Sequence, residues 1–316
     1  MRRFIALLLV LLLAVSAAAA DPLGITVREE DGGEFRPLPI SLEGGSPLPY
    51  EFDYNQKFSF YEDPTIRVER YRVDGSEWGA TYWYATVTLK DASQLRTASA
   101  SVNNPFLDGT IVPCHGIAKR NRAVLAINGD YCASFSSEKP TDFILRQGVV
   151  YRDSVMPGLD LLLIDEDGDF HILNPDETDL ETADKTTVNG KKVINAFQFG
   201  PALVINGEPV PDEKVLDYGR CPHFTNPDRR AQRMIICQTG PLQYMVLCCA
   251  NYGLPLTTMR DLALSLGPVQ TAYNLDGGES SQISFLGRWF NNGANGNTKA
   301  RGITDIIYFA SAWFKD

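Results

Sequence analysis

The residues of this chain that could do chemistry stand at the ends of apolar runs. Asp276 follows the run 272–275 and is itself followed by Gly277 and Gly278. A strand that ends in such a turn presents a carboxylate and backbone N–H groups at one point, because glycine lets a ligand approach the main chain. The sequence therefore predicts a catalytic corner at Asp276.

Two more motifs have the same form. They are AINGD at 126–130 and FGP at 199–201. A single Asn-Gly or Asp-Gly turn is most often an ordinary connection between strands. Three such strand ends with two carboxylates favour a binding site instead. The residues that we expect to contact substrate are Asn128, Gly129, Gly200, Gly277, Gly278 and Ser280.

Acidic residues in these motifs are candidates for catalysis. Asp130 and Asp276 form the natural pair for acid–base or nucleophilic work, and Glu279 is a third candidate. Hydrolysis of a glycosidic bond uses two carboxylates. Arg233 stands just before the apolar run 234–236, where a planar guanidinium suits the capture of phosphate or carboxylate.

Other chemistries find less support in the sequence. The segment 278–282 lacks the second glycine of a serine nucleophile elbow. The chain has three His and no C-x-x-C pair, so a zinc site is not expected, and we expect no cofactor. A divalent-metal phosphodiesterase with Asp130, Asp276 and Glu279 as oxygen ligands remains an open alternative.

The N-terminus has the pattern of a signal peptide over residues 1–20. Arg2 and Arg3 are followed by the apolar stretch 4–15 and by small residues at 18–20, which is the pattern of a cleavable leader. The stretch is short for a membrane span and no basic cluster follows it. We therefore expect a secreted mature chain without a membrane span.

Composition limits the partners. The chain has 316 residues and a formal net charge of −10, so it lacks the basic surface of a nucleic-acid-binding protein. Residues 21–65 are rich in Pro, Gly and acidic residues and are expected to form an irregular extension. Compact structure is expected from about residue 66, as one domain over 66–316.

The elements that position the motifs are mostly short strands. Alternation in 66–71 and 83–89 predicts a hairpin. Apolar residues spaced as on one helix face predict a helix over 257–266, with Thr258 and Asp261 as a capping box. The sequence predicts an α+β fold with many short strands in mixed or antiparallel sheets and a few helices.

Six cysteines are present, an even count that in a secreted chain suggests disulfides. Cys248 and Cys249 are adjacent in an apolar run. Their side chains must point to opposite faces of a strand, so they are interpreted as small buried hydrophobic residues.

The motifs together resemble those of the phosphodiester glycosidase family, over roughly residue 66 to the C-terminus. They are AINGDY (126–131), FILRQGVVYRD (143–153), FGPALVINGE (199–208), RMIICQ (233–238) and NLDGGESS (274–281). The resemblance implies hydrolysis of a sugar-1-phosphodiester, of the N-acetylglucosamine-1-phosphodiester kind, at the anomeric carbon. Bacterial members are often linked to exopolysaccharide, so the implied partner is a sugar phosphate or a phosphodiester-linked glycan.

The implied chemistry is physically reasonable. A phosphate monoester has a second pKa of about 6 and leaves readily, so charge stabilisation matters more than a general acid. Arg233 is then predicted to hold the phosphate, and Asp276 or Asp130 to act as base or nucleophile.

Some residues depart from the family pattern. Cys132 and Cys237 stand where an aromatic residue and a glycine are usual, and Glu279 stands where a small residue is common. We predict that the two cysteines are spatial neighbours that could form a disulfide. A secreted carbohydrate-binding or cell-surface polymer-binding protein that has lost catalysis remains the alternative to an enzyme.

Overall fold

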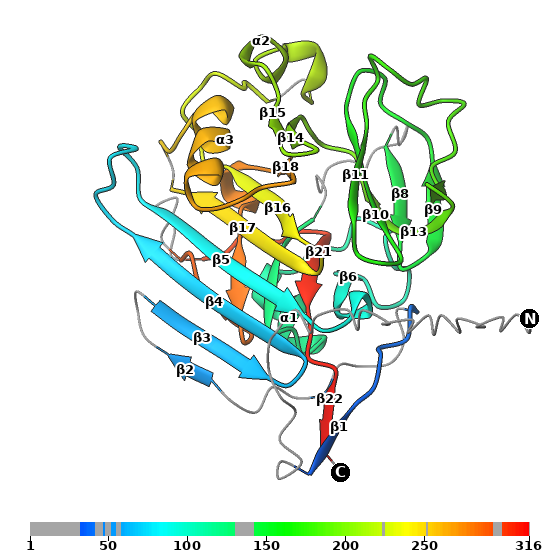
Figure 1. Ribbon diagram of the computed structural model, residues 1–316, viewed down its shortest axis with the longest axis vertical. Helices are drawn as coiled ribbons and strands as arrows, with labels where there is room; N and C mark the ends of the chain where they lie inside the picture. Colours follow the sequence, from blue (N-terminus) through cyan, green and yellow to red (C-terminus); the bar gives the residue numbers. More distant parts are fainter. Residues whose placement is uncertain are drawn as a thin grey trace, which may run out of the picture.

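A computed structural model describes residues 32–41, 47, 52–54, 58–129, 142–222, 225–250, 252–292 and 299–315. Within these residues the protein is mostly β, with several antiparallel sheets and three short α-helices (Figure 1). The predicted short strands and few helices are confirmed. The α+β description fits only loosely, because the helices cover so little of the described chain.

The largest sheet has nine strands. In spatial order they are β15 (Glu208–Pro209), β14 (Ala202–Ile205), β18 (Thr271–Leu275), β16 (Met234–Gly240), β17 (Gln243–Cys249), β5 (Tyr82–Leu89), β4 (Ile66–Val73), β3 (Phe58–Asp63) and β2 (Phe52–Tyr54). The predicted hairpin is confirmed as the antiparallel pair of β4 and β5. Alternate residues of β4, such as Ile66 and Val68, are buried, which is the pattern of a strand with one face on the core.

A five-stranded sheet packs against this one. Its strands in order are β20 (Arg288–Trp289), β19 (Ile283–Phe285), β7 (Leu125–Asn128), β21 (Asp305–Phe309) and β6 (Leu95–Ser99). Side chains from both sheets, including Val68, Leu125, Tyr273 and Ile307, share one buried core. The two sheets therefore form a β-sandwich.

Helices cover the outer faces of the sandwich. Helix α3 (Leu256–Ser265) packs on the nine-stranded sheet, and α1 (Cys114–Arg120) packs on the five-stranded sheet. The single-turn helix α2 (Asp212–Val215) lies near α3 (Figure 1).

The helix predicted over 257–266 is confirmed as α3, but its predicted capping box is wrong. The helix begins directly after Pro255, which makes no side-chain cap. Thr258 lies inside the first turn, so its hydroxyl cannot serve as the N-cap.

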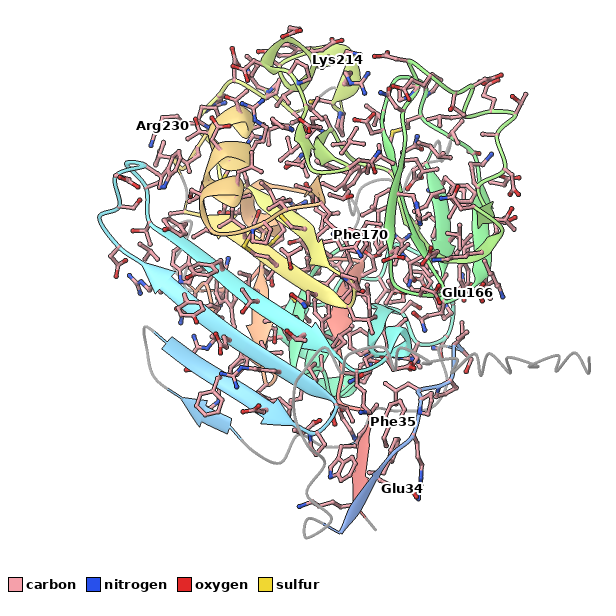
Figure 2. The ribbon with its side chains drawn as sticks, in the orientation of Figure 1. Glu34, Phe35, Glu166, Phe170, Lys214 and Arg230 are labelled. Atoms are coloured by element: carbon pink, nitrogen blue, oxygen red, sulfur yellow. The ribbon has the colours of Figure 1, made fainter. Side chains whose placement is uncertain are left out.

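A six-stranded sheet forms a side lobe, green in Figure 1. It contains β11 (Phe170–Leu173), β10 (Leu161–Asp165), β13 (Lys191–Phe197), β8 (Phe143–Arg146) and β9 (Val149–Asp153), with β12 (Thr187–Val188) paired to β13. Phe170, labelled in Figure 2, joins the lobe to the sandwich. Its ring lies 5.4 Å from that of Tyr244 on β17, and its N–H donates to Oε1 of Gln238 at 2.9 Å.

The N-terminal part of the described chain is less irregular than the sequence suggested. Strand β1 (Gly33–Phe35) pairs with β22 (Trp313–Lys315), and β2 and β3 extend the nine-stranded sheet before Ile66. Residues 1–20 lie outside the described residues, so the signal peptide stays a prediction. Within the described parts, no helix has the length and apolar character needed to span a membrane.

The cysteines of the described residues are buried free thiols. Cys248 faces the sandwich core and Cys249 faces the α3 layer, which confirms the predicted opposite orientation. Cys237 is a free thiol that packs among the residues under α3, so the predicted disulfide with Cys132 is wrong. Cys132 lies outside the described residues, and its proximity to Cys237 stays a prediction.

Candidate active site

The motifs AING and NLDGG meet at one corner of the sandwich. Asp276 follows β18 directly, and Asn128 ends β7. The Asn128 side chain is fully buried and donates to the backbone oxygen of Asp276 at 2.9 Å. Its Oδ1 accepts the N–H of Gln282 at 3.2 Å. The Asn128 side chain thus holds the turn after β18, in the nine-stranded sheet, against the end of β7, in the five-stranded sheet.

The two glycines after Asp276 are required for different reasons. A Cβ on Gly277 would lie 2.8 Å from the backbone oxygen of Gln232, so a side chain there would collide with the segment before β16. Gly278 has φ +58° and donates its N–H to that same oxygen at 2.9 Å. The turn can therefore pack directly against the start of β16.

The Asp276 carboxyl group is buried, with 6% of the residue exposed. Burial raises the pKa of Asp276 to about 6, against the lowering effect of the nearby Ser280 hydroxyl and the Arg301 charge. Within the described residues, Oδ2 of Asp276 and Oγ of Ser280 have no partner in full hydrogen-bond geometry, although the Ser280 hydroxyl is close enough to the carboxyl group to lower its pKa.

Other unpaired polar atoms lie beside this turn. Oε1 of Gln232 and Oδ1 of Asn274 are buried and have no hydrogen-bond partner in the described part of the chain. Buried polar atoms in proteins are nearly always paired. Their concentration next to Asp276 indicates a site for a polar ligand.

A buried ion pair supports the corner. Nη2 of Arg146, at the end of β8, lies 3.0 Å from Oδ2 of Asp305, at the start of β21, and both side chains are fully buried. The Arg146 guanidinium also stacks on the ring of Phe197 at 3.9 Å. The pair ties the side lobe to the sandwich, and the Asp305 charge acts to raise the pKa of Asp276.

Gly129 lies against this ion pair. Its N–H donates to the backbone oxygen of Asp305 at 3.1 Å, and a Cβ on it would lie 2.5 Å from Oδ1 of Asp305. The predicted importance of Gly129 therefore has a steric cause, the close approach of a buried carboxylate.

We expect Gly129→Ala to destabilise the protein by about 1–3 kcal/mol, because the added methyl group must displace the Asp305 carboxylate or the strand end. Urea unfolding followed by circular dichroism measures the effect. Gly240→Ala is the matched control, since a Cβ there meets its nearest atom at an ordinary 3.6 Å. Equal stability of the two variants would contradict this explanation.

Arg233 is close to the corner in the sheet but its side chain is engaged elsewhere. The register that pairs Met234 with Leu275 places residue 233 opposite residue 276. Its guanidinium, however, donates to the backbone oxygens of Asn226 at 2.6 Å and Arg229 at 3.0 Å. Burial lowers the pKa of Arg233.

Arg301 is a cation near Asp276 that the sequence-based prediction did not include. It is exposed, and its charge lowers the pKa of Asp276. Nε2 of Gln282 donates to the backbone oxygen of Arg301 at 2.9 Å. This hydrogen bond holds residue 301 beside the segment that follows the Asp276 turn. Arg301 follows a Gly- and Asn-rich stretch. No motif in that stretch marks Arg301 as a candidate site residue.

The remaining predicted residues lie in different settings. Gly200 is beside β18, where its backbone oxygen accepts Nδ2 of Asn274 at 2.7 Å, so the FGP motif reaches the same strand. The Glu279 side chain is exposed on the 3₁₀ turn Gly278–Ser280.

Asp130 lies outside the described residues, so its pairing with Asp276 stays a prediction. The described residues contain no group of three His, Cys, Asp or Glu side chains suited to a metal ion.

The β-sandwich therefore holds a buried carboxyl group, that of Asp276, beside several polar atoms without hydrogen-bond partners in the described residues. This arrangement is typical of a site that binds a polar ligand through a carboxylate. The sequence model of one family, described as phosphodiester glycosidase, matches residues 121–310, which is more than half of the chain. The chain belongs to the phosphodiester glycosidase family.

Solved structures share the fold. The catalytic domain of zebrafish N-acetylglucosamine-1-phosphodiester alpha-N-acetylglucosaminidase, auto-inhibited by its pro-peptide, aligns with a TM-score of 0.60 and 14% identity over 84% of this chain and 87% of that chain. A hypothetical protein from Synechocystis aligns with a TM-score of 0.54 and 15% identity over 84% of this chain and 69% of that chain. No curated protein sequence matches the chain.

Proposed function

We propose that the protein hydrolyses a sugar-1-phosphodiester at the anomeric carbon and releases a phosphate monoester. The observation that carries the proposal is the buried Asp276 carboxyl group, whose pKa is raised to about 6 and whose Oδ2 has no partner in full hydrogen-bond geometry in the described residues. Membership of the phosphodiester glycosidase family supports the reaction class. The zebrafish structure points to an N-acetylglucosamine-1-phosphodiester as the first substrate to try.

In the proposed reaction, Asp276 is the general base. It takes a proton from a water molecule as the water oxygen bonds to the anomeric carbon. The bond from that carbon to the phosphate oxygen breaks, and its electron pair leaves with the phosphate monoester. A base with a pKa close to the working pH is the most effective, which suits the raised pKa of Asp276. Asp130 is the proposed second carboxylate of the site.

The leaving phosphate needs a cation more than it needs a proton, because its second pKa is about 6. We assign this role to Arg301, whose charge already acts on the Asp276 carboxyl group. A guanidinium can bind two phosphate oxygens side by side. Arg233 is assigned to hold the loop at 226–229, to whose backbone oxygens it donates.

The N-terminal pattern supports a proposal for the place of action. The basic, apolar and small-residue segments of residues 1–20 match the pattern of a secretory leader. We propose that the mature chain is exported and acts on a phosphodiester-linked glycan outside the cytoplasm.

Hydrolysis of methyl N-acetylglucosamine-1-phosphodiester in heavy-oxygen water tests the proposal. We expect the heavy oxygen in the sugar, because the carbon–oxygen bond breaks. Heavy oxygen in the phosphate would instead indicate attack at phosphorus, as in a metal-dependent phosphodiesterase. Binding of the substrate without release of methyl phosphate would indicate a binding protein. Either result would overturn the proposed function.

A further inference from the structure

A fully buried glutamine, Gln282, follows the turn that holds Asp276, and its amide side chain bridges two distant segments of the chain. Oε1 of Gln282 accepts the backbone N–H of Cys114 at 3.1 Å, and Nε2 donates to the backbone oxygen of Arg301 at 2.9 Å. The first contact supplies an acceptor at the start of α1, where Pro113 makes no side-chain cap. Because the amide oxygen can only accept and the nitrogen can only donate, the two contacts fix the orientation of the amide.

The backbone N–H of Gln282 joins this bridge to the proposed general base. It donates to Oδ1 of Asn128 at 3.2 Å, and Nδ2 of Asn128 donates to the backbone oxygen of Asp276 at 2.9 Å. Asn128 is also fully buried. Two buried amide side chains thus connect the backbone of Asp276 with the backbone of Arg301, and a change at Gln282 is expected to move the two relative to each other.

The chain around Arg301 is held from two sides. On the C-terminal side, Ile303 and Val112 exchange both backbone hydrogen bonds at 3.0 Å. Gln282 holds the chain two residues earlier, at the point where the exposed Arg301 side chain leaves the backbone. The position from which the guanidinium starts is therefore set by the Gln282 amide as well as by the bridge to Val112.

Two charges of opposite sign act on the Asp276 carboxyl group. Burial raises the pKa of Asp276 to about 6, the Arg301 charge lowers it, and the Asp305 charge raises it. Asp305 is paired with Arg146 in the buried ion pair, and the Glu279 carboxyl group on the same turn is exposed. Arg301 is thus the charge at this site that the buried amide holds in place.

We propose that Gln282 is a positioning residue for the reaction: its amide side chain holds the backbone of Arg301 so that the guanidinium meets the phosphate beside Asp276. The proposal rests on the proposed function, since it concerns the same site. Because Gln282 is fully buried, it acts through Arg301 and not on the substrate.

Gln282→Met removes the amide and keeps an unbranched side chain of similar length. We expect KM for methyl N-acetylglucosamine-1-phosphodiester to rise by about tenfold or more, because the hydrogen bonds from the guanidinium to the phosphate weaken. The Kd of the product methyl phosphate, measured by calorimetry, should rise by the same factor. The acidic limb of the pH–rate profile should move to higher pH, because the pKa of Asp276 rises when the Arg301 charge no longer acts on it.

Gln94→Met is the matched control. Gln94 is also fully buried, its Oε1 accepts the N–H of Asp91 at 3.0 Å, and its Nε2 donates to the backbone oxygen of Ala310 at 2.9 Å. Ala310 follows the end of β21, whereas Asp305 lies at its start, beside the candidate site. We expect the two variants to lose similar free energy of unfolding, but only Gln282→Met to change phosphate binding and the pH–rate profile.

A double-mutant cycle with Arg301→Met, at an exposed position, separates positioning from a general loss of structure. In the Arg301→Met background, Gln282→Met should cause no further change in methyl phosphate binding or in the pKa of Asp276, which carbon-13 NMR measures with Asp276→Asn for assignment. If Gln282→Met does not fold, Gln282→Asn takes its place. It keeps a buried amide that is one methylene group too short to reach both segments, so the same direction of change is expected.

The outcomes separate the two proposals. Unchanged phosphate binding and an unchanged pKa of Asp276 in the folded Gln282 variant, or effects that add fully to those of Arg301→Met, would overturn the positioning role and leave the proposed function standing. Hydrolysis of no sugar phosphodiester would overturn the proposed function. A change in the pKa of Asp276 that Arg301→Met abolishes would still support the positioning role in that case, because this measurement does not depend on turnover.

Discussion

The Asp276→Asn variant is expected to lose turnover and at the same time to become more stable at neutral pH. Removing a general base lowers the rate by about 10²–10⁴-fold. The Asn side chain has nearly the same shape and stays neutral. It therefore avoids the cost of burying a charged carboxylate at the end of β18.

The gain in stability depends on pH in a defined direction. Burial raises the folded-state pKa of Asp276 to about 6, above the value of about 3.9 expected in the unfolded chain. The folded protein therefore holds this proton more tightly than the unfolded chain does. Protonation of Asp276 therefore stabilises the folded wild type fully below about pH 4, and this stabilisation of the wild type is lost as the pH rises through about 6. The advantage of Asp276→Asn over the wild type appears above that pH.

Unfolding in urea at a series of pH values measures this. Above about pH 6, Asp276→Asn is expected to exceed the wild type by about 2–3 kcal/mol, and near pH 4 the two should be equal. Glu279→Gln is the matched control, because that carboxyl group lies in the same turn and is exposed. A variant that keeps full turnover, or that is less stable than the wild type at every pH, would refute the assigned role of Asp276.

Loss of the Arg146–Asp305 ion pair is expected to cost the protein more stability than loss of an ion pair on its surface. Arg146→Met removes the fully buried guanidinium that pairs with Asp305, and breaking such a pair costs about 3–5 kcal/mol. Because the pair joins the side lobe to the sandwich beside Gly129, we also expect activity to fall with the stability of this corner.

A double-mutant cycle separates the pair from its surroundings. Arg146→Met with Asp305→Asn is expected to be more stable than Arg146→Met alone, since both members of the buried ion pair are then neutral. Arg67→Met is the control, because Arg67 pairs with Glu69 on the surface with 42% of its side chain exposed, and such pairs contribute about 1 kcal/mol or less. Equal losses of unfolding free energy in Arg67→Met and Arg146→Met would show that burial does not increase the contribution of the Arg146–Asp305 pair to stability.

Local patterns in the sequence were sufficient for several elements and for the central turn, but not for strands β1 to β3. Alternation predicted β4 and β5, and helical spacing predicted α3, because each pattern depends on neighbours within one element. The boundary of α3 was less secure. The capping box at Thr258 matched a pattern, but Pro255 already sets the start of the helix.

The contacts of the proposed catalytic corner at Asp276 were decided by the tertiary structure. Asn128 meets the backbone of Asp276 across 148 positions, and Arg146 meets Asp305 across 159 positions. Which strand ends share an edge depends on sheet order and on how the sheets pack, and no local pattern encodes either. The same reason explains the cations: Arg233 stood at a suitable strand start, but the fold directs its side chain to the 226–229 loop and brings Arg301 near Asp276.

The sequence by itself determined that Asp276 ends a strand and that two glycines follow it. The tertiary structure decided that this carboxyl group is buried and that its pKa lies near 6. The physical reason is that a pKa responds to burial and to nearby charges, and both are set by chain segments that are distant in sequence and meet only in the folded sandwich.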